Sequence, residues 1–120
     1  MTNEATIQAR LRLEWARRGD ILWRNNVGAL PDPRGVPVRF GLANDSAAVN
    51  AHVKSGDLIG IKRVLITPDM VGAVVGVFVS REVKAGGWRY AGTPREVAQQ
   101  RWIDLVRSLG GDASFITDDS

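Results

Sequence analysis

The chain of 120 residues has no cysteine, so it can form neither a disulfide nor a thiolate metal site. It also lacks any run of about 18 apolar residues, which is the length that a membrane-spanning helix needs. The first ten residues contain no apolar stretch of the kind found in signal peptides. We therefore expect a cytoplasmic protein without a membrane partner.

Lysine is also scarce: the chain has three lysines against thirteen arginines, and its net charge is +3. Arginine binds a phosphate through two parallel hydrogen bonds, which lysine cannot do. An arginine-rich basic domain fits a nucleic-acid partner. A genome with a high GC content explains the same bias equally well, so charge alone leaves both interpretations open.

Apolar residues make up 44% of the chain and charged residues 24%, which is ordinary for a globular protein. The length suits a single domain over residues 1–120. Periodicity, caps and breakers predict the order helix, strands, helix, strand. The expected fold class is α/β, with a mixed central sheet of four or five strands flanked by helices. The predicted elements are a helix from a Thr2 or Asn3 cap to about Arg18, a strand at 21–23, a loop at 26–36, a weak strand at 36–40, a helical turn at 46–52, strands at 58–66 and 73–84, a helix from a Thr93 cap to about Leu109, and a strand at 113–117.

The valine-rich strand predicted at 73–84 ends in a Glu-Val-Lys sequence. Because side chains alternate between the two faces of a strand, Glu82 and Lys84 share one face at its carboxyl end. Asp57 stands where the preceding predicted strand begins, after Gly56. An ordinary turn aspartate and a solvated Glu-X-Lys pair are the plainer interpretation.

If their two strands are neighbours, the carboxylates of Asp57 and Glu82 can face one cleft and bind a metal ion. Close carboxylates repel each other unless a cation lies between them. Mg²⁺ prefers such oxygen ligands, lowers the pKa of bound water and stabilises charge on a phosphoryl oxygen. Lys84 is then placed to hold or activate the attacking water, or to neutralise developing charge. The pattern predicts metal-dependent hydrolysis of a phosphodiester.

These residues resemble the PD-(D/E)XK nuclease superfamily, and more of the chain resembles its VRR-NUC family. The similarity extends from about Glu4 to Thr117, and the chain is similar to stand-alone members, which are often from phages. One departure is Ser80, which is polar where an apolar residue is usual. The matching segments are Trp23-Arg24-Asn25-Asn26-Val27-Gly28, Phe40-Gly41, Asp57-Leu58-Ile59-Gly60, Glu82-Val83-Lys84, Gln99 with Trp102, and Gly110-Gly111.

The resemblance implies a Mg²⁺- or Mn²⁺-dependent deoxyribonuclease with a restriction-endonuclease-like fold and no small-molecule cofactor. Asp57, Glu82 and the backbone carbonyl of Val83 would bind the metal, and Lys84 would be the catalytic lysine. Some relatives cut branched DNA as homodimers, which implies a structure-specific activity and a dimer here. The expected location is the cytoplasm of a bacterium or of a phage-infected cell.

A helix glutamine that follows the motif lies by the site in this family, and two candidates stand side by side. Trp102 and Val106 belong to the apolar arc of the helix at 100° per residue. Gln99 falls inside this arc and Gln100 outside it. A glutamine on a buried face needs a polar partner, which an active site provides, so we choose Gln99. Satisfaction by the backbone is the alternative.

Glu4 is assigned by the same reasoning from helix faces. It shares a face with Ile7, Gln8 and Leu11. A carboxylate on an inward face suggests a further metal-linked group, and the family carries an acid near this point. A first-turn acid that favours the helix dipole is the other interpretation.

Several polar or aromatic residues are candidates for DNA contacts. Arg24 and Asn25 match the family after a strand, and Arg39 and Lys62 are further candidates for phosphate contacts. Trp88 lies in a glycine-rich loop, from which an indole can stack on a base. Ordinary surface roles are the alternative for each of these polar residues.

Two other classes of function stay open. The chain can be a DNA-binding module that keeps the fold without cutting, or a phage adaptor protein in which the acidic pair is fortuitous. A steep fall of affinity with salt would indicate phosphate contacts and separate binders from adaptors. Metal-dependent cleavage separates the nuclease from both.

Overall fold

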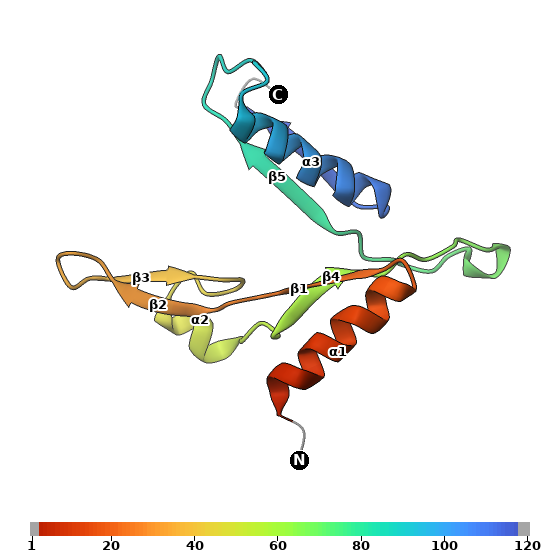
Figure 1. The fold of residues 1–120 in the computed structure, drawn as a ribbon, viewed down its shortest axis with the longest axis horizontal. Helices are drawn as coiled ribbons and strands as arrows, with labels where there is room; N and C mark the ends of the chain where they lie inside the picture. The colour runs from red at the N-terminus through yellow and green to blue at the C-terminus, as the bar shows by residue number, and fades with distance from the viewer. Residues whose placement is uncertain (1–2, 118–120) are drawn as a thin grey trace. The chain divides into compact units, whose positions relative to one another are not determined.

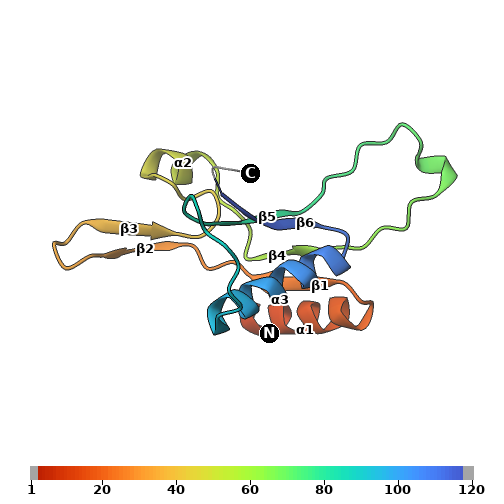
Figure 2. The same ribbon diagram turned by 90° about the horizontal axis from the view of Figure 1, so that it is seen from above.

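The computed structural model describes residues 3–117, and the chain divides into two compact units, Met1–Gly60 and Ile61–Ser120. Each unit is described here by itself. Within residues 3–117 the structure is mixed α/β, with three α-helices and six short strands (Figures 1 and 2). No helix in this part of the chain has the length and apolar character that crossing a membrane requires.

The first unit opens with helix α1, Glu4–Arg17, which packs on strand β1, Ile21–Arg24 (Figure 1). Asn3 caps α1, because its side-chain oxygen accepts a hydrogen bond from the backbone N–H of Thr6 at 2.9 Å. The alternative cap, Thr2, lies outside the described residues.

Strand β1 pairs with strand β4, Leu58–Ile61. This pairing requires a glycine at position 60, because a Cβ atom there would come within 1.8 Å of the carbonyl oxygen of Ile21. The close approach of the two backbones holds the start of β4, and therefore the segment next to Asp57, against β1.

A β-hairpin follows β1. The strand predicted at 36–40 is confirmed, and its partner strand lies in the segment predicted as a loop at 26–36. Strands β2, Gly28–Pro31, and β3, Pro37–Phe40, pair antiparallel, with Leu30 opposite Val38. The carboxylate of Asp32 closes the turn by accepting the backbone N–H groups of Arg34 and Val36 at 2.8 and 2.9 Å.

The base of the hairpin is tied by Asn44, which is buried. Its amide donates to the carbonyl oxygens of Gly28 and Phe40, at 2.7 and 2.8 Å. The expected helical turn follows as helix α2, Ala47–His52, which Ser46 caps through the N–H of Val49.

The second unit contains a β-α-β arrangement. Strands β5, Val79–Val83, and β6, Asp112–Ile116, pair in parallel, and helix α3, Pro94–Ser108, connects them and packs on both. The short 3-10 helix η1, Pro68–Met70, stands at the predicted turn.

The α3 helix begins and ends where its sequence predicts. Thr93 and Glu96 form the expected capping box at its start. Gly110 follows its end with φ +91°, a left-handed conformation that glycine adopts without strain. Ile103 and Val106 of α3 are almost fully buried, at 2% and 0% exposure, and form the core together with Ala113 of β6.

One expectation about the strands is wrong. The strands predicted at 58–66 and 73–84 are regular only over Leu58–Ile61 and Val79–Val83, because β-branched residues form a ladder only where a partner strand is present. Within residues 3–117 the six strands form three two-stranded sheets, β1-β4, β2-β3 and β5-β6. They show no central sheet of four or five strands.

Candidate functional site

Glu82 and Lys84 lie at the carboxyl end of β5, on the side of the strand that faces α3. Exposure alternates along β5: Ser80 and Glu82 are half-buried, whereas Val79 and Val83 are 55% and 73% exposed. The valine side chains therefore do not form the packed face of this strand within the unit. The polar face is the one that the helix covers.

A hydrogen bond from Trp102 explains why Ser80 is polar. The indole Nε1–H of Trp102 on α3 donates to the Ser80 hydroxyl at 2.9 Å, and the ring meets Phe78 edge-to-face with centroids 6.4 Å apart. An apolar residue at position 80 would leave the indole N–H of Trp102, between α3 and β5, without this acceptor. The polar residue at position 80 thus has a local partner, which anchors α3 over β5.

Gln99 joins Glu82 to Lys84 through its side-chain amide. The Lys84 ammonium donates to Gln99 Oε1 at 2.8 Å, and Gln99 Nε2 donates to Glu82 Oε1 at 2.9 Å. The direct separation of Lys84 Nζ from Glu82 Oε1 is 3.9 Å. Because the amide oxygen faces the cation and the amide N–H faces the carboxylate, the three groups hold one another in a single arrangement.

Gln100 makes a different contact, on the exposed side of α3. Its amide donates to the carboxylate of Asp104, one turn further along the helix, at 2.9 Å. Helix geometry therefore separates the two glutamines as the sequence analysis expects, since only Gln99 contacts Glu82 and Lys84.

A hollow of about 350 Å³ opens beside Glu82, lined by Arg95, Ala98, Gln99 and Trp102 besides Glu82 itself. The side chain of Glu82 is 38% exposed, against 16% for Lys84, so the carboxylate is the more accessible of the two groups. Arg95 is a residue that sequence reasoning missed. Its position four residues before Gln99 places it on the same helix face, which is the signal that identifies it.

Trp88 is committed to contacts inside the second unit. Its indole N–H donates to Glu96 Oε2 at 2.8 Å, and its ring packs on Phe115 with centroids 4.9 Å apart. The Lys84 ammonium lies 5.5 Å from the centre of the Trp88 ring. In this structure Trp88 is therefore a packed ring next to Lys84, and its stacking on a base stays a prediction.

Asp57 immediately precedes β4 in the first unit, and Asn25 holds the turn that presents it. The backbone N–H of Asn25 donates to the carbonyl oxygen of Asp57 at 2.9 Å. The Asn25 amide donates to the Ser55 hydroxyl and to the carbonyl oxygen of Gly56, at 2.8 and 2.9 Å. Asn25, which was expected to contact DNA, thus uses its side-chain donor to shape the segment before Asp57.

Asp57 and Glu4 line one hollow of the first unit, about 380 Å³ in volume, together with Ile7, Gln8, Leu11 and Leu58. Both carboxylate residues are exposed. The helix face expected from the sequence is the face that lines this hollow. Glu4 and Asp57 can therefore present their oxygens to the same space.

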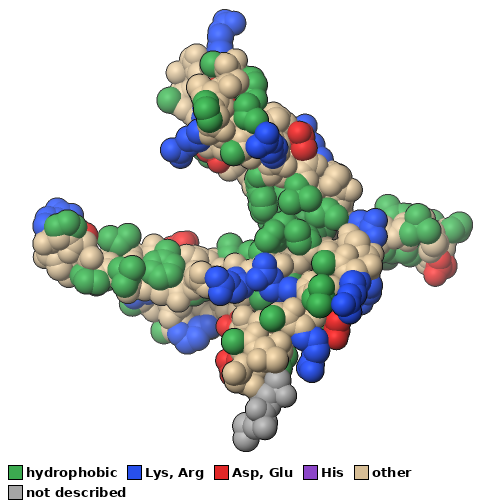
Figure 3. Space-filling view, viewed as in Figure 1, with side chains coloured by type: hydrophobic (Ala, Val, Ile, Leu, Met, Phe, Trp, Pro, Cys, Tyr) green, Lys and Arg blue, Asp and Glu red, His purple; other side chains and the backbone are tan. Residues whose placement is uncertain are grey.

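The remaining basic candidates are in different local surroundings. Arg24 and Lys62 are exposed, and Arg39 donates to the side-chain oxygen of Asn44 at 2.8 Å. Figure 3 shows Lys and Arg side chains at the surface of both units. The sequence expectation of phosphate contacts stays a prediction for these three residues.

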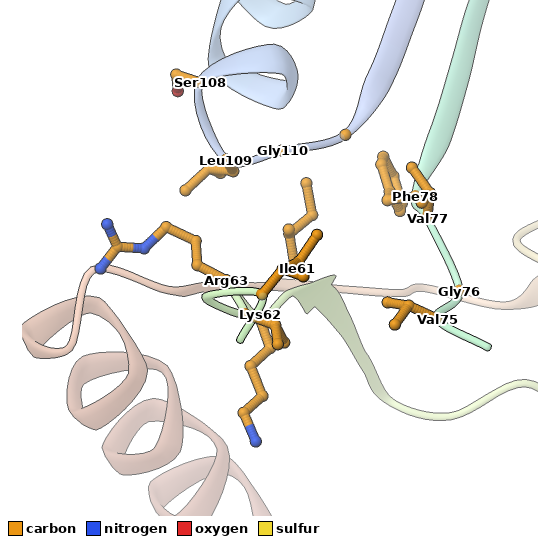
Figure 4. A pocket seen from close by; sticks show the side chains of 13 residues that line it. Ile61, Lys62, Arg63, Val75, Gly76, Val77, Phe78, Ser108, Leu109 and Gly110 are labelled. Atoms are coloured by element: carbon orange, nitrogen blue, oxygen red, sulfur yellow. The ribbon is translucent and has the colours of Figure 1, made fainter. Parts of the chain in front are cut away.

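A third hollow, of about 440 Å³, lies in the second unit between segments 61–66 and 75–78 and the end of α3 (Figure 4). Apolar side chains such as Ile61, Phe78 and Leu109 dominate it, and no acidic residue lines it. The ammonium of Lys62 points away from these apolar side chains. This hollow therefore has no carboxylate with which to bind a metal ion.

No metal cluster is gathered in the described part of the chain, where no three His, Cys, Asp or Glu residues lie close enough to hold an ion. The chemistry of the donors is nevertheless that of a hard cation. Glu4, Asp57 and Glu82 are all accessible carboxylates beside hollows, and carboxylate oxygens are the ligands that Mg²⁺ prefers.

Comparisons of the chain with family models, with curated proteins and with solved structures find no match.

Proposed function

We propose that the chain is a metal-dependent deoxyribonuclease of the VRR-NUC type, which hydrolyses phosphodiester bonds. The observation that carries the proposal is the bridge from Lys84 through Gln99 to Glu82. An ordinary strand-end Glu-X-Lys pair is solvated. Here the lysine is largely covered, an amide from α3 holds it, and the carboxylate is left at a hollow.

The donor set fits a divalent cation. Asp57, Glu82 and the backbone carbonyl of Val83 would hold Mg²⁺ or Mn²⁺, with Glu4 as a further carboxylate beside Asp57. When bound, the metal would supply charge stabilisation at a phosphoryl oxygen and a lower pKa for water. The proposed fold is restriction-endonuclease-like, with a mixed central sheet flanked by helices.

The residues of the second unit have complementary tasks in such a reaction. Water forms a bond to phosphorus, the bond from phosphorus to the leaving sugar oxygen breaks, and the proton lost by water balances the one that the leaving oxygen gains. Lys84 would offset the negative charge that develops at phosphorus. Arg95, at the hollow beside Glu82, supplies a guanidinium that can hold a neighbouring phosphate through two hydrogen bonds.

DNA is the proposed partner, and the proposed assembly is a homodimer. A domain of this size has little surface with which to embrace a duplex. Two copies related by a twofold axis present two sites to two strands and can span a branch point. A structure-specific activity on branched DNA follows from such an assembly.

The test is a cleavage assay on labelled linear duplex, single-stranded and four-way-junction DNA, in Mg²⁺, Mn²⁺ or EDTA. Lys84→Ala is compared with the wild type and with Lys54→Ala. Lys54 is a suitable control because its ammonium donates to the side chain of Asn50 on an exposed surface. We expect metal-dependent cutting that Lys84→Ala slows strongly and Lys54→Ala leaves unchanged.

Two results would contradict the proposal. Absence of cutting with salt-sensitive DNA binding intact indicates a non-catalytic binding module. Absence of both cutting and DNA binding indicates an adaptor protein. A homodimer is tested separately by sedimentation, since a monomeric nuclease would contradict only that part of the proposal.

A further inference from the structure

The Lys84 ammonium is enclosed by more than its polar partners. Besides Gln99 Oε1 at 2.8 Å, it has the ring centres of Trp88 and Phe115 at 5.5 and 5.7 Å. Aromatic rings attract a cation at such distances through their quadrupole, and the attraction is stronger when water is excluded. The two rings therefore restrict the directions in which the ammonium can move.

The Trp88 ring is itself held in place, although it lies on a loop with Gly86 and Gly87. Its indole N–H donates to Glu96 Oε2 at 2.8 Å, one face packs on Phe115, and Tyr90 meets it edge-to-face at 6.4 Å. These three contacts hold the Trp88 ring in one orientation.

Glu96 makes two hydrogen bonds more than its capping box needs. Its Oε1 accepts the backbone N–H of Thr93 at 3.0 Å, which completes the capping box, and also that of Ala91 at 3.2 Å. Its Oε2 accepts the Trp88 indole, which is no part of a helix cap. Glu96 is also buried, at 6% exposure, whereas first-turn acids are usually solvated.

We propose that Glu96 and Trp88 are positioning residues for Lys84: the carboxylate orients the indole, and the indole, with Phe115, directs the ammonium toward Gln99 and Glu82. The catalytic consequence rests on the proposed nuclease function. The contact itself does not depend on that function. Neither residue need touch DNA.

The contact is tested first by NMR of the metal-free protein. Lys84 is one of only three lysines, so its ε-methylene signal can be assigned with Lys84→Arg. A methylene next to aromatic rings is shifted upfield by their ring currents, which exposed Lys54 and Lys62 do not experience. We expect Trp88→Leu to move the Lys84 signal toward the other two.

Glu96→Gln separates the two tasks of Glu96. Glutamine also completes a capping box, so its single side-chain oxygen can still accept the backbone N–H groups. Its NH₂ group then faces the indole N–H, and two donors cannot bond. We expect the helix content measured by circular dichroism to be unchanged and the Lys84 signal to move. Trp15→Leu, which removes a ring that contacts Arg18 in the first unit, is the matched control and should not move it.

The cleavage assay then tests the consequence. Small displacements of a catalytic group cost up to about 100-fold in rate, so we expect Trp88→Leu to lower kcat by about 10- to 100-fold with KM nearly unchanged. A raised KM with unchanged kcat would overturn the proposal and make Trp88 a DNA contact. A Lys84 signal that is not upfield, or that ignores Trp88→Leu, overturns it whatever the nuclease assay gives. A shift that behaves as expected in a protein that cuts nothing upholds the contact and refutes the nuclease.

Discussion

Replacing Gln99 by alanine should impair catalysis far more than replacing its neighbour Gln100. Gln99→Ala removes two hydrogen bonds to charged partners, one from the Lys84 ammonium and one to the Glu82 carboxylate. A hydrogen bond to a charged group contributes about 1.5–3 kcal/mol. Water can reach the half-exposed Glu82 and replace one bond, whereas Lys84 is largely covered and has less access to water.

We therefore count about one such bond as lost in the transition state, which corresponds to a rate about 10- to 100-fold slower. Gln100→Ala loses only an exposed contact with Asp104 on the same helix, worth about 0.2–0.5 kcal/mol to stability. Its cleavage rate should stay within about twofold of the wild type, since Gln100 contacts neither Glu82 nor Lys84.

The assay is single-turnover cleavage of the best DNA substrate in Mg²⁺, with both variants also made in a Lys84→Ala background. If Gln99 acts by holding Lys84, its removal should add little once Lys84 is absent, because residues in one network are not additive. Equal effects of Gln99→Ala and Gln100→Ala would refute the assignment from helix geometry. Additive effects of Gln99→Ala and Lys84→Ala would refute the proposed linkage.

Three further predictions concern the carboxylates and their supports. Asp57→Ala and Glu82→Ala should each abolish cutting while circular dichroism shows an intact fold, and full activity of Glu82→Ala would defeat the metal-site assignment. Asn25→Ala should lower the free energy of unfolding in urea by about 1–3 kcal/mol, because it leaves partners in the turn before Asp57 unpaired. The affinity for DNA, measured in EDTA, should be unchanged. A weaker affinity would show that Asn25 contacts DNA directly. The pKa of Glu96 is lowered from its ordinary value of 4.5, mainly because its carboxylate accepts the backbone N–H of Thr93. The ionised carboxylate therefore stabilises the folded state fully above that value, and this stabilisation is lost as the pH falls through the lowered pKa. In urea, the free energy of unfolding should fall less steeply with acid in Glu96→Gln than in the wild type.

The helices were predictable because their ends are set by local chemistry. Thr93, Pro94 and Glu96 specify the start of α3 within one turn, and Ser46 does the same for α2. The strands were less predictable, since a strand ends where its partner ends. The valine run before β5 has the composition of a strand but is regular only from Val79, where β6 lies alongside.

The hairpin β2–β3 is a case in which a strand was missed instead of overpredicted. Glycine and proline made residues 26–36 look like a loop, yet Asp32 closes a tight turn through two backbone N–H groups and allows the flanking residues to pair. The signal was present in the aspartate and in Gly35 after it, because side-chain-to-backbone bonding of this kind is a property of aspartate in turns.

The sequence by itself determined which side chains share a face. The twofold alternation of a strand places Glu82 beside Lys84, and the helical period separates Gln99 from Gln100. Only the tertiary structure decided which face meets which: α3 covers the polar side of β5, so that Gln99 bridges the pair. It likewise assigned Trp88 to Lys84 and Asn25 to the turn at Asp57. The physical reason is that side-chain direction within an element follows from local backbone geometry, whereas contacts between elements depend on packing among residues far apart in the chain.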